Sequence, residues 1–262
     1  MAVIWMGTGR FAPDYDTDAQ AYITAVEAAD AAAGQSGGLE SGVKNAINAF
    51  VVGCKADGIW SAIKASCILA GARTLNGCLV PLVGTAPTNF NFVAGDYNRE
   101  TGLKGDGSTK YLNSNRANNA DPQDSNHVGT WASETFANNT LIMAGSNPSA
   151  PGNNAIVANA STQWNLRSRN STADFNQGTR TDNSLVAISR SSASGYQLRS
   201  NTTTTSITRT SQTPSSDNIW ILRGATYGTH RIAFYSIGES LDLALLDARV
   251  TTLINAIAAA IP

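Results

Sequence analysis

The chain has 262 residues, of which 42% are hydrophobic, and a formal net charge of -1 at pH 7. This length suits one large domain, or a domain with a smaller partner, and either can bury a hydrophobic core. A charge so close to zero gives no electrostatic basis for binding nucleic acid, and no uninterrupted apolar run approaches the length of a membrane span. We therefore expect neither a nucleic-acid partner nor insertion into a membrane.

Charged residues make up only 14% of the chain, below the roughly 25% of an average soluble domain. Ser, Thr and Asn take their place, as in the run at 201–206. Such residues suit exposed strand faces, and they also suit surfaces that contact sugars or other copies of the chain.

The charges are unevenly distributed along the sequence. All five lysines precede residue 111, whereas residues 139–238 hold eight arginines against three aspartates. One interpretation is solvated or interface-facing charge that protects strand edges. The other is contact with an acidic polysaccharide or a negatively charged neighbouring subunit, because the arginine fork matches carboxylates and sulfates.

Residues 1–13 form a short apolar segment that is too small to fold alone. The segment suits an edge strand or a frayed end. It also suits an anchor peptide that holds the protein to a larger assembly through Val3, Ile4, Trp5 and Phe11. No basic region precedes the apolar run and no convincing cleavage site follows it, so we expect no signal peptide.

Residues 14–72 show helical periodicity in three stretches. The first two are expected to bury apolar positions within 22–33 and 39–54. A third helix is expected after the turn at 57–58, with the inward residues Trp60, Ile63, Cys67 and Ile68. Because the connections are short, residues 14–87 are expected to form a compact helical assembly region that packs on the rest of the chain or on sister chains.

The three cysteines include no Cys-x-x-Cys pair. We expect Cys54, Cys67 and Cys78 to be buried free thiols, as in a protein made in a reducing cytoplasm. With only two histidines in the chain, the sequence also shows no zinc-ligand cluster and no catalytic triad.

Residues 79–87 read as a linker whose prolines disfavour helix. From residue 88 onward, short β-type segments alternate with clusters of Asn, Gly and Pro, and no βα alternation calls for a parallel sheet. This pattern predicts a mostly β protein in which residues 88–262 form an antiparallel sandwich of jelly-roll type.

The chain is expected to close with two strands, 218–223 and 231–237, followed by a helix that starts near Leu241 with Ser240 as its N-cap. Apolar residues recur at helical spacing from there to Ile261. The helix is expected to cover the sandwich or to meet the N-terminal helices, which would leave both ends of the chain near one pole.

Glycoside hydrolysis needs two carboxylates at a fixed short separation. The five glutamates form no Glu-x-Asp-x-Glu pattern. Glu134 lies near Trp131 and Phe136 and is the best candidate for a cleft acid, but it has no partner in the sequence. We therefore expect a non-enzymatic protein, with a glycan-cleaving enzyme as the alternative.

Two tryptophans offer a clue to binding. Trp131 and Trp164 lie in β-type segments, where an exposed ring would stack on a sugar; core packing is the alternative for both. With Arg167, Arg169 and Arg199 they form the candidate glycan-binding set.

The run 121–126 is the one candidate metal site. Asp121, Asp124 and Asn126 provide oxygen atoms that suit Ca²⁺, although Asp and Asn clusters also form simple turns. No other cofactor is expected.

The stretch Gly102–Leu112, with the sequence GLKGDGSTKYL, resembles the opening hairpin of concanavalin A-like, laminin-G-like lectin domains. The last strand and the start of the following helix, at Ile232–Leu241, are similar to the closing element of those domains. The resemblance covers roughly residues 88–262, and it implies a concanavalin A-like jelly roll that binds glycan.

Residues 57–75 resemble segments of structural proteins of tailed phages and related particles. This resemblance implies a virion structural protein, namely a fibre, spike or capsid decoration subunit that is homo-oligomeric, contacts other virion proteins and is made in the host cytoplasm. Its lectin-like domain would then contact a host-surface polysaccharide.

Overall fold

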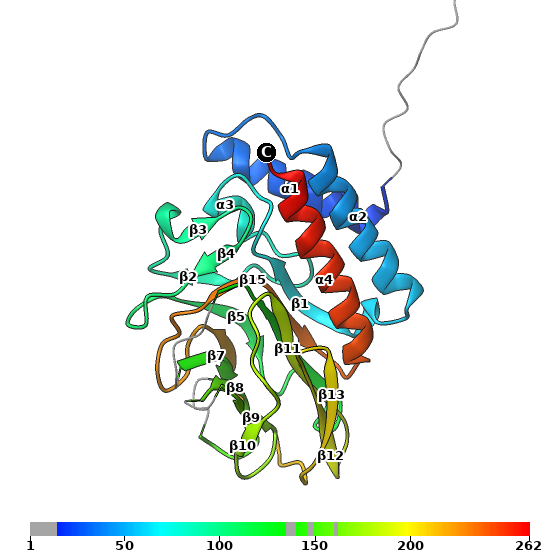
Figure 1. The fold of residues 1–262 in the computed structure, drawn as a ribbon, viewed down its shortest axis with the longest axis vertical. Coiled ribbons are helices and arrows are strands. Elements are labelled where there is room, and N and C mark those ends of the chain that lie inside the picture. The colour runs from blue at the N-terminus through cyan, green and yellow to red at the C-terminus, as the bar shows by residue number, and fades with distance from the viewer. Residues whose placement is uncertain (1–14, 135–139, 146–148, 160–161) are drawn as a thin grey trace, which may run out of the picture.

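The computed structural model describes residues 15–134, 140–145, 149–159 and 162–262. Two antiparallel sheets pack face to face, and helices cover the outside of one of them (Figure 1). The predicted fold class, a mostly β jelly-roll sandwich with N-terminal helices and a C-terminal helix, is confirmed. The predicted anchor residues Val3, Ile4, Trp5 and Phe11 lie outside the described residues.

The first sheet has eight strands in the order β13-β12-β11-β6-β15-β4-β3, and β1 pairs with part of β15. The bounds of these strands are β1 (Ile63–Ile68), β3 (Tyr97–Asn98), β4 (Gly102–Lys104), β6 (Asn126–Ala132), β11 (Ser184–Ser192), β12 (Gly195–Ser200), β13 (Thr203–Thr208) and β15 (Arg231–Gly238). Every residue of β6 is buried, because the helices cover one face of this sheet and the second sheet covers the other.

The second sheet has seven strands in the order β10-β9-β8-β7-β14-β5-β2. The bounds of these strands are β2 (Thr88–Phe90), β5 (Tyr111–Ala117), β7 (Thr140–Gly145), β8 (Asn154–Ala158), β9 (Trp164–Ser168), β10 (Asp174–Gln177) and β14 (Asn218–Ile221). Inner residues such as the Ile156 and Leu166 pair are fully buried in the main core. Within the described ranges, the helices pack on the first sheet and not on the other face of this one.

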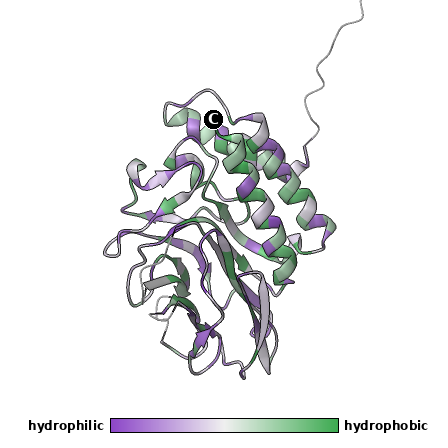
Figure 2. Ribbon diagram, viewed as in Figure 1, coloured by the Kyte–Doolittle hydropathy of each residue, from purple (hydrophilic) through white to green (hydrophobic). Residues whose placement is uncertain are grey.

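The helical layer consists mainly of α1 (Thr17–Ala32), α2 (Ser41–Ala56) and α4 (Leu243–Ala260). α3 (Leu75–Cys78) packs on α1, and the short 3-10 helix η1 (Trp60–Ala62) packs on α2. A second 3-10 helix, η2 (Ala94–Asp96), comes directly before β3. Figure 2 shows apolar segments in these helices and in the strands beneath them. All three cysteines are free and buried, as predicted.

Helix α4 meets both α2 and the first sheet, as the sequence predicted for the terminal helix. It is long and apolar enough to cross a membrane, but its stripe Leu246, Val250, Leu253 and Ile257 is buried in the core. The predicted N-cap is wrong by two residues. Asp242, and not Ser240, accepts hydrogen bonds from the backbone N–H groups of residues 244 and 245, because a carboxylate oxygen suits the unpaired donors of a first turn.

The predicted third helix is wrong, because residues 63–68 form strand β1. This strand pairs antiparallel with β15, and Cys67 lies opposite Tyr235. Five of its six residues are buried, so the strand shows none of the alternation that identifies a half-exposed strand, and a short apolar run cannot be assigned by periodicity alone. The segment 14–87 therefore supplies a strand to the sandwich, and its helices share one hydrophobic core with both sheets.

Candidate functional site

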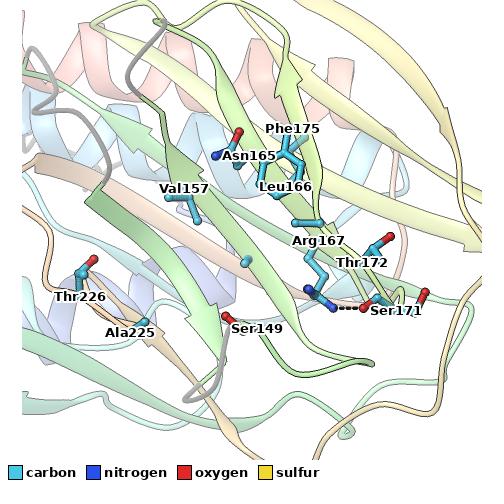
Figure 3. A pocket seen from close by; sticks show the side chains of 12 residues that line it. Ser149, Val157, Asn165, Leu166, Arg167, Ser171, Thr172, Phe175, Ala225 and Thr226 are labelled. Atoms are coloured by element: carbon cyan, nitrogen blue, oxygen red, sulfur yellow. Dashed lines mark hydrogen bonds between the residues drawn. The ribbon is translucent and has the colours of Figure 1, made fainter.

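A hollow of about 510 Å³ lies on the outer face of the seven-stranded sheet (Figure 3). Strands β8, β9 and β10 form its floor and one wall, and the loop after β14 closes the opposite side. Its lining residues are Ser149, Ala155, Val157, Asn165, Leu166, Arg167, Ser171, Thr172, Ala173, Phe175, Ala225 and Thr226.

Small side chains between large ones create this hollow. Cross-strand pairing places Trp220 opposite Ala144, Ala144 opposite Ala155, and Ala155 opposite Arg167. Directly paired residues of an antiparallel sheet project from the same face, so the four side chains form one row across four strands. The row is about 14 Å long, or three strand spacings. The two central residues of the row are alanines, so small side chains lie in the middle and the large side chains of Trp220 and Arg167 lie at the two ends.

The floor of the hollow is separate from the main core. Ala144, Ala155 and Val157 form a small apolar cluster of their own on the outer face. The side chain of Asn165, which is paired with Val157 across β8 and β9, adds a polar group beside this floor. A surface of this kind offers apolar contact in the middle and hydrogen-bonding groups at the edge.

Phe175 is the exposed aromatic residue of the site, with 63% of its surface accessible. Its neighbour Asp174 is buried, accepts a hydrogen bond from the hydroxyl of Tyr196 at 2.7 Å and pairs with Arg209 at 2.5 Å. Successive residues of a strand point to opposite faces. The buried contacts of Asp174 therefore fix Phe175 on the outside, at the edge of the hollow (Figure 3).

Arg167 is the only charged residue that lines the hollow within the described part of the chain. Its Nη1 donates to the backbone carbonyls of Ala150 at 3.2 Å, Asn170 at 2.9 Å and Ser171 at 2.7 Å; Figure 3 shows the last of these bonds. Burial lowers the pKa of the guanidinium, whereas the nearby carboxylate of Asp174 opposes that shift. These contacts hold a positive charge at the wall of the site.

A second cluster of large side chains borders the hollow on the same face of the sheet. The ring of Phe90 stacks on that of Tyr111, with centroids 4.3 Å apart. The guanidinium carbon of Arg223 lies 4.2 Å from the ring centroid of Trp220, 4.3 Å from that of Tyr111 and 5.0 Å from that of Tyr227. We call these five residues the aromatic-arginine cluster.

The two predicted tryptophans do not belong to this site. Trp131 and Trp164 are only 2% and 1% exposed, and the indole Nε1 of Trp164 donates to Ser200 Oγ at 2.8 Å. The prediction that their rings stack on a sugar is wrong, because both lie between the layers of the fold. Core packing, the alternative, is the correct interpretation.

Of the three predicted arginines, the structure brings only Arg167 to the hollow. Arg199 on β12 pairs with Asp247 of α4 at 2.8 Å and so joins the sheet to the helical layer. Arg169 is 1% exposed and donates to backbone carbonyls of the loop that follows β5, including that of Asp121 at 3.1 Å. Arg169 and Arg199 therefore have structural contacts.

The same loop contains the candidate calcium ligands. Both carboxylate oxygens of Asp121 accept hydrogen bonds from Arg116, at 3.1 and 2.5 Å. Arg169 donates hydrogen bonds to backbone carbonyls of the same loop, those of Asp121 and Gln123. Asp124 and Asn126 have buried side-chain oxygens without a hydrogen-bond partner. Two arginines thus take the place that a cation would have at Asp121, and calcium binding by this loop stays a prediction.

Glu134, the candidate catalytic acid, does not line the hollow. It pairs with Arg231 at 2.5 Å and with Lys104 at 2.8 Å. Burial raises its pKa, but hydrogen bonds from these two cations outweigh burial and hold the pKa below the usual value of 4.5. A general acid requires a raised pKa, so this environment is the opposite of the one that the role demands.

The sequence does not predict Phe175, Trp220 or Arg223 as site residues. Phe175 lies in the polar run Asp-Phe-Asn-Gln, which carries little strand signal. The sequence correctly predicts a strand at Trp220, but the neighbours of this residue across the sheet depend on a register that no local pattern reveals. A large aromatic residue within a polar run was the one available signal.

No protein-family model matches the chain. No curated protein matches it either. Similar solved structures include a botulinum neurotoxin serotype D binding domain, with 12% identity, a TM-score of 0.49, and coverage of 73% of this chain and 51% of that one. They also include domain 4 of a GH43 extracellular arabinanase from Geobacillus stearothermophilus in complex with arabinotriose, with 13% identity, a TM-score of 0.43, and coverage of 66% and 82%.

A third similar structure is an arabinofuranosidase complexed with arabinofuranosyl-alpha-1,2-xylobiose, with 14% identity, a TM-score of 0.41, and coverage of 76% of this chain and 43% of that one. The chain spans about half the length of the toxin domain that it matches. At these identities and TM-scores, the similarities assign no ligand and no activity to this chain.

Proposed function

We propose that this chain is a non-enzymatic structural subunit that binds glycan in the hollow on the outer face of its seven-stranded sheet. The observation that carries the proposal is the combination of an apolar floor, an exposed aromatic wall and polar edges in one hollow. A sugar ring has apolar C–H faces and hydroxyl edges, so it matches a site that offers both kinds of contact.

The lining of the hollow favours binding over cleavage. None of its described lining residues is Asp or Glu, whereas glycoside hydrolysis in most families requires two carboxylates that flank the bond. Glu134, the best acid candidate, lies elsewhere and is paired with two cations.

The first test is a glycan array probed with the wild-type protein and with Phe175→Ala. Loss of one stacked ring is expected to weaken binding about five- to tenfold. Val93→Ala is the matched control, because Val93 is 60% exposed and does not line the hollow. Equal binding by Phe175→Ala and the wild type, or no binding to any glycan, would contradict the proposal.

A second variant tests the hollow by filling it. Val157 is a partly buried residue of the floor, and an aromatic side chain suits an outward strand position. Val157→Phe is therefore expected to fold normally and to abolish glycan binding. Unchanged affinity in a folded Val157→Phe protein would place the ligand elsewhere.

The virion role forms the second part of the proposal. It is supported by the resemblance of residues 57–75 and by the helical layer, which lies on the opposite side of the sandwich from the hollow. Assembly through the helices would leave the hollow accessible. Light scattering is expected to give a mass of at least twice 27.4 kDa, and mass spectrometry is expected to find the chain in purified particles. A purely monomeric protein that is absent from particles would contradict this role.

A further inference from the structure

The outer face of the seven-stranded sheet carries positive charge without a matching acid. Among the described residues, neither Arg167 nor Arg223 forms an ion pair. Arginines elsewhere, such as Arg199 and Arg231, are paired with carboxylates. Asp174 is the carboxylate that acts on Arg167 among the described residues, and it is already bound by Arg209 and Tyr196.

Three aromatic rings surround the guanidinium of Arg223. The guanidinium carbon of Arg223 lies within 5.0 Å of the ring centroids of Trp220, Tyr111 and Tyr227, and such cation–π contacts leave the N–H groups available for hydrogen bonds. The Nε atom is buried and has no hydrogen-bond partner. The three rings therefore surround a guanidinium whose side chain forms no hydrogen bond within the described part of the chain.

The loop after β14 connects Arg223 with the hollow. The backbones of Arg223 and Tyr227 form a β-bridge, and the N–H of Gly224 donates to the carbonyl of Thr226 at 2.9 Å. The tip of this loop, Ala225 and Thr226, is part of the lining of the hollow. A ligand that fills the hollow thus lies between Arg167 at one wall and the loop that bears Arg223 at the other.

We propose that the hollow selects acidic saccharides, and that the carboxylate of a uronic acid is the group recognised by Arg223 and attracted by Arg167. This inference rests on the proposed function, because it specifies the class of glycan bound at the same site. Arginine suits the role since its planar fork matches a carboxylate in two hydrogen bonds, and the floor of alanines and valine contacts the apolar face of the ring.

The test compares matched pairs of saccharides that differ only in charge. Oligomers of galacturonate, glucuronate and mannuronate are immobilised beside their carboxyl-reduced, neutral counterparts, and the wild-type protein is titrated over each pair. At least one acid is expected to bind about tenfold more tightly than its neutral form. The ratio is expected to fall as salt is raised, because ions screen the attraction.

The variant Arg223→Gln is expected to lower the acid-to-neutral ratio, because the hydrogen bonds of the guanidinium to the carboxylate are lost while the attraction by Arg167 remains. Lys104→Gln is the control: it removes one positive charge from an exposed site on the other sheet, and it is expected to leave the ratio unchanged.

Binding of the neutral saccharides as tightly as the acids would overturn the inference and leave the proposed glycan function intact. Absence of binding to acidic and neutral saccharides alike would overturn both. An equal drop of the acid-to-neutral ratio in Lys104→Gln and Arg223→Gln would show that the net charge of the protein, and not this site, sets the preference.

Discussion

His127 on β6 is fully buried and has both ring nitrogens engaged. Its Nδ1 lies 2.5 Å from the carbonyl oxygen of Glu239 and its Nε2 lies 2.7 Å from Ser236 Oγ. A carbonyl can only accept, so Nδ1 carries the proton and Nε2 accepts from the serine hydroxyl. Burial lowers the pKa of His127 from 6.5 to about 4, although the bond to Glu239 opposes that shift. The residue is therefore a neutral structural group at pH 7.

This assignment predicts an acid-dependent loss of stability. Below pH 6.5 the unfolded chain binds a proton at His127 while the folded chain does not, so the free energy of unfolding falls until the pH reaches about 4. The loss from this site is about 3 kcal/mol at pH 4. The measurement is urea unfolding of the wild type and of His127→Gln between pH 7 and pH 4. The variant is expected to be less stable at pH 7 and to lose less stability on acidification; parallel curves would contradict the assignment.

At the scale of the elements, β15 is the strand on which the fold depends. It pairs with β1, β4 and β6, and its last residue, Gly238, lies against the backbone of η1. A Cβ atom at Gly238 would lie 2.0 Å from the carbonyl oxygen of Ala62. Neither backbone segment can move without breaking the pairing of β1 with β15.

Gly238→Ala is therefore expected to lower the free energy of unfolding by about 1 to 3 kcal/mol. Gly95→Ala is the matched control, because a Cβ atom at Gly95 has no heavy atom within 4 Å, and its effect is expected to stay within about 0.5 kcal/mol. Chemical denaturation of both variants at pH 7 provides the comparison. Equal stability of the two variants would mean that the strands separate more easily than the structure implies.

Elements with a regular period could be predicted from the sequence. The apolar stripe of α4 and the strand 231–237 appear where the sequence placed them. β1 could not be distinguished from a helix, because both of its faces are buried and its partner β15 lies about 170 residues further along the chain. The same burial on two faces explains why Trp131, on β6, is a core residue.

The site could be predicted only in part, because it too depends on contacts between elements that are distant in the sequence. The excess of arginine in residues 139–238 is visible in the sequence, and Arg167 is one of the arginines predicted to bind glycan. Which arginines are paired with acids depends on contacts between distant elements, such as that of Arg199 with Asp247. Trp220 and Arg167 reach one face through the pairing of four strands, and that register follows from the whole fold.

At the scale of the whole molecule, the helical layer covers the first sheet, and strands β8, β9 and β10 lie on the opposite side of the sandwich (Figure 1). The outer face of these three strands carries the hollow. Together with the proposed virion role, this polarity predicts that the helices face inward in the assembled particle and that β8, β9 and β10 face the solvent. The native cysteines do not interfere with a labelling test, since burial raises the pKa of Cys54 and Cys67 to about 12 and the third thiol is also buried.

The test introduces one exposed cysteine at a time, by Thr226→Cys at the hollow or Thr252→Cys on α4. Both positions are exposed in the isolated chain, so both variants are expected to react with a bulky maleimide before assembly. In purified particles, only the cysteine at position 226 is expected to react, because the reagent cannot enter an assembly contact. Labelling at 252 with protection at 226 would reverse the proposed polarity.

The pairing of β1 with β15 also constrains how the protein is made. Residues 63–68 leave the ribosome long before residues 234–238, with which they pair. Helix α2 likewise lacks its packing partner until α4 has been synthesised. Contacts so distant in sequence slow folding and keep apolar surface exposed during synthesis. We expect the nascent N-terminal part to depend on chaperones until the last strand and helix emerge, and chains that lack α4 to aggregate.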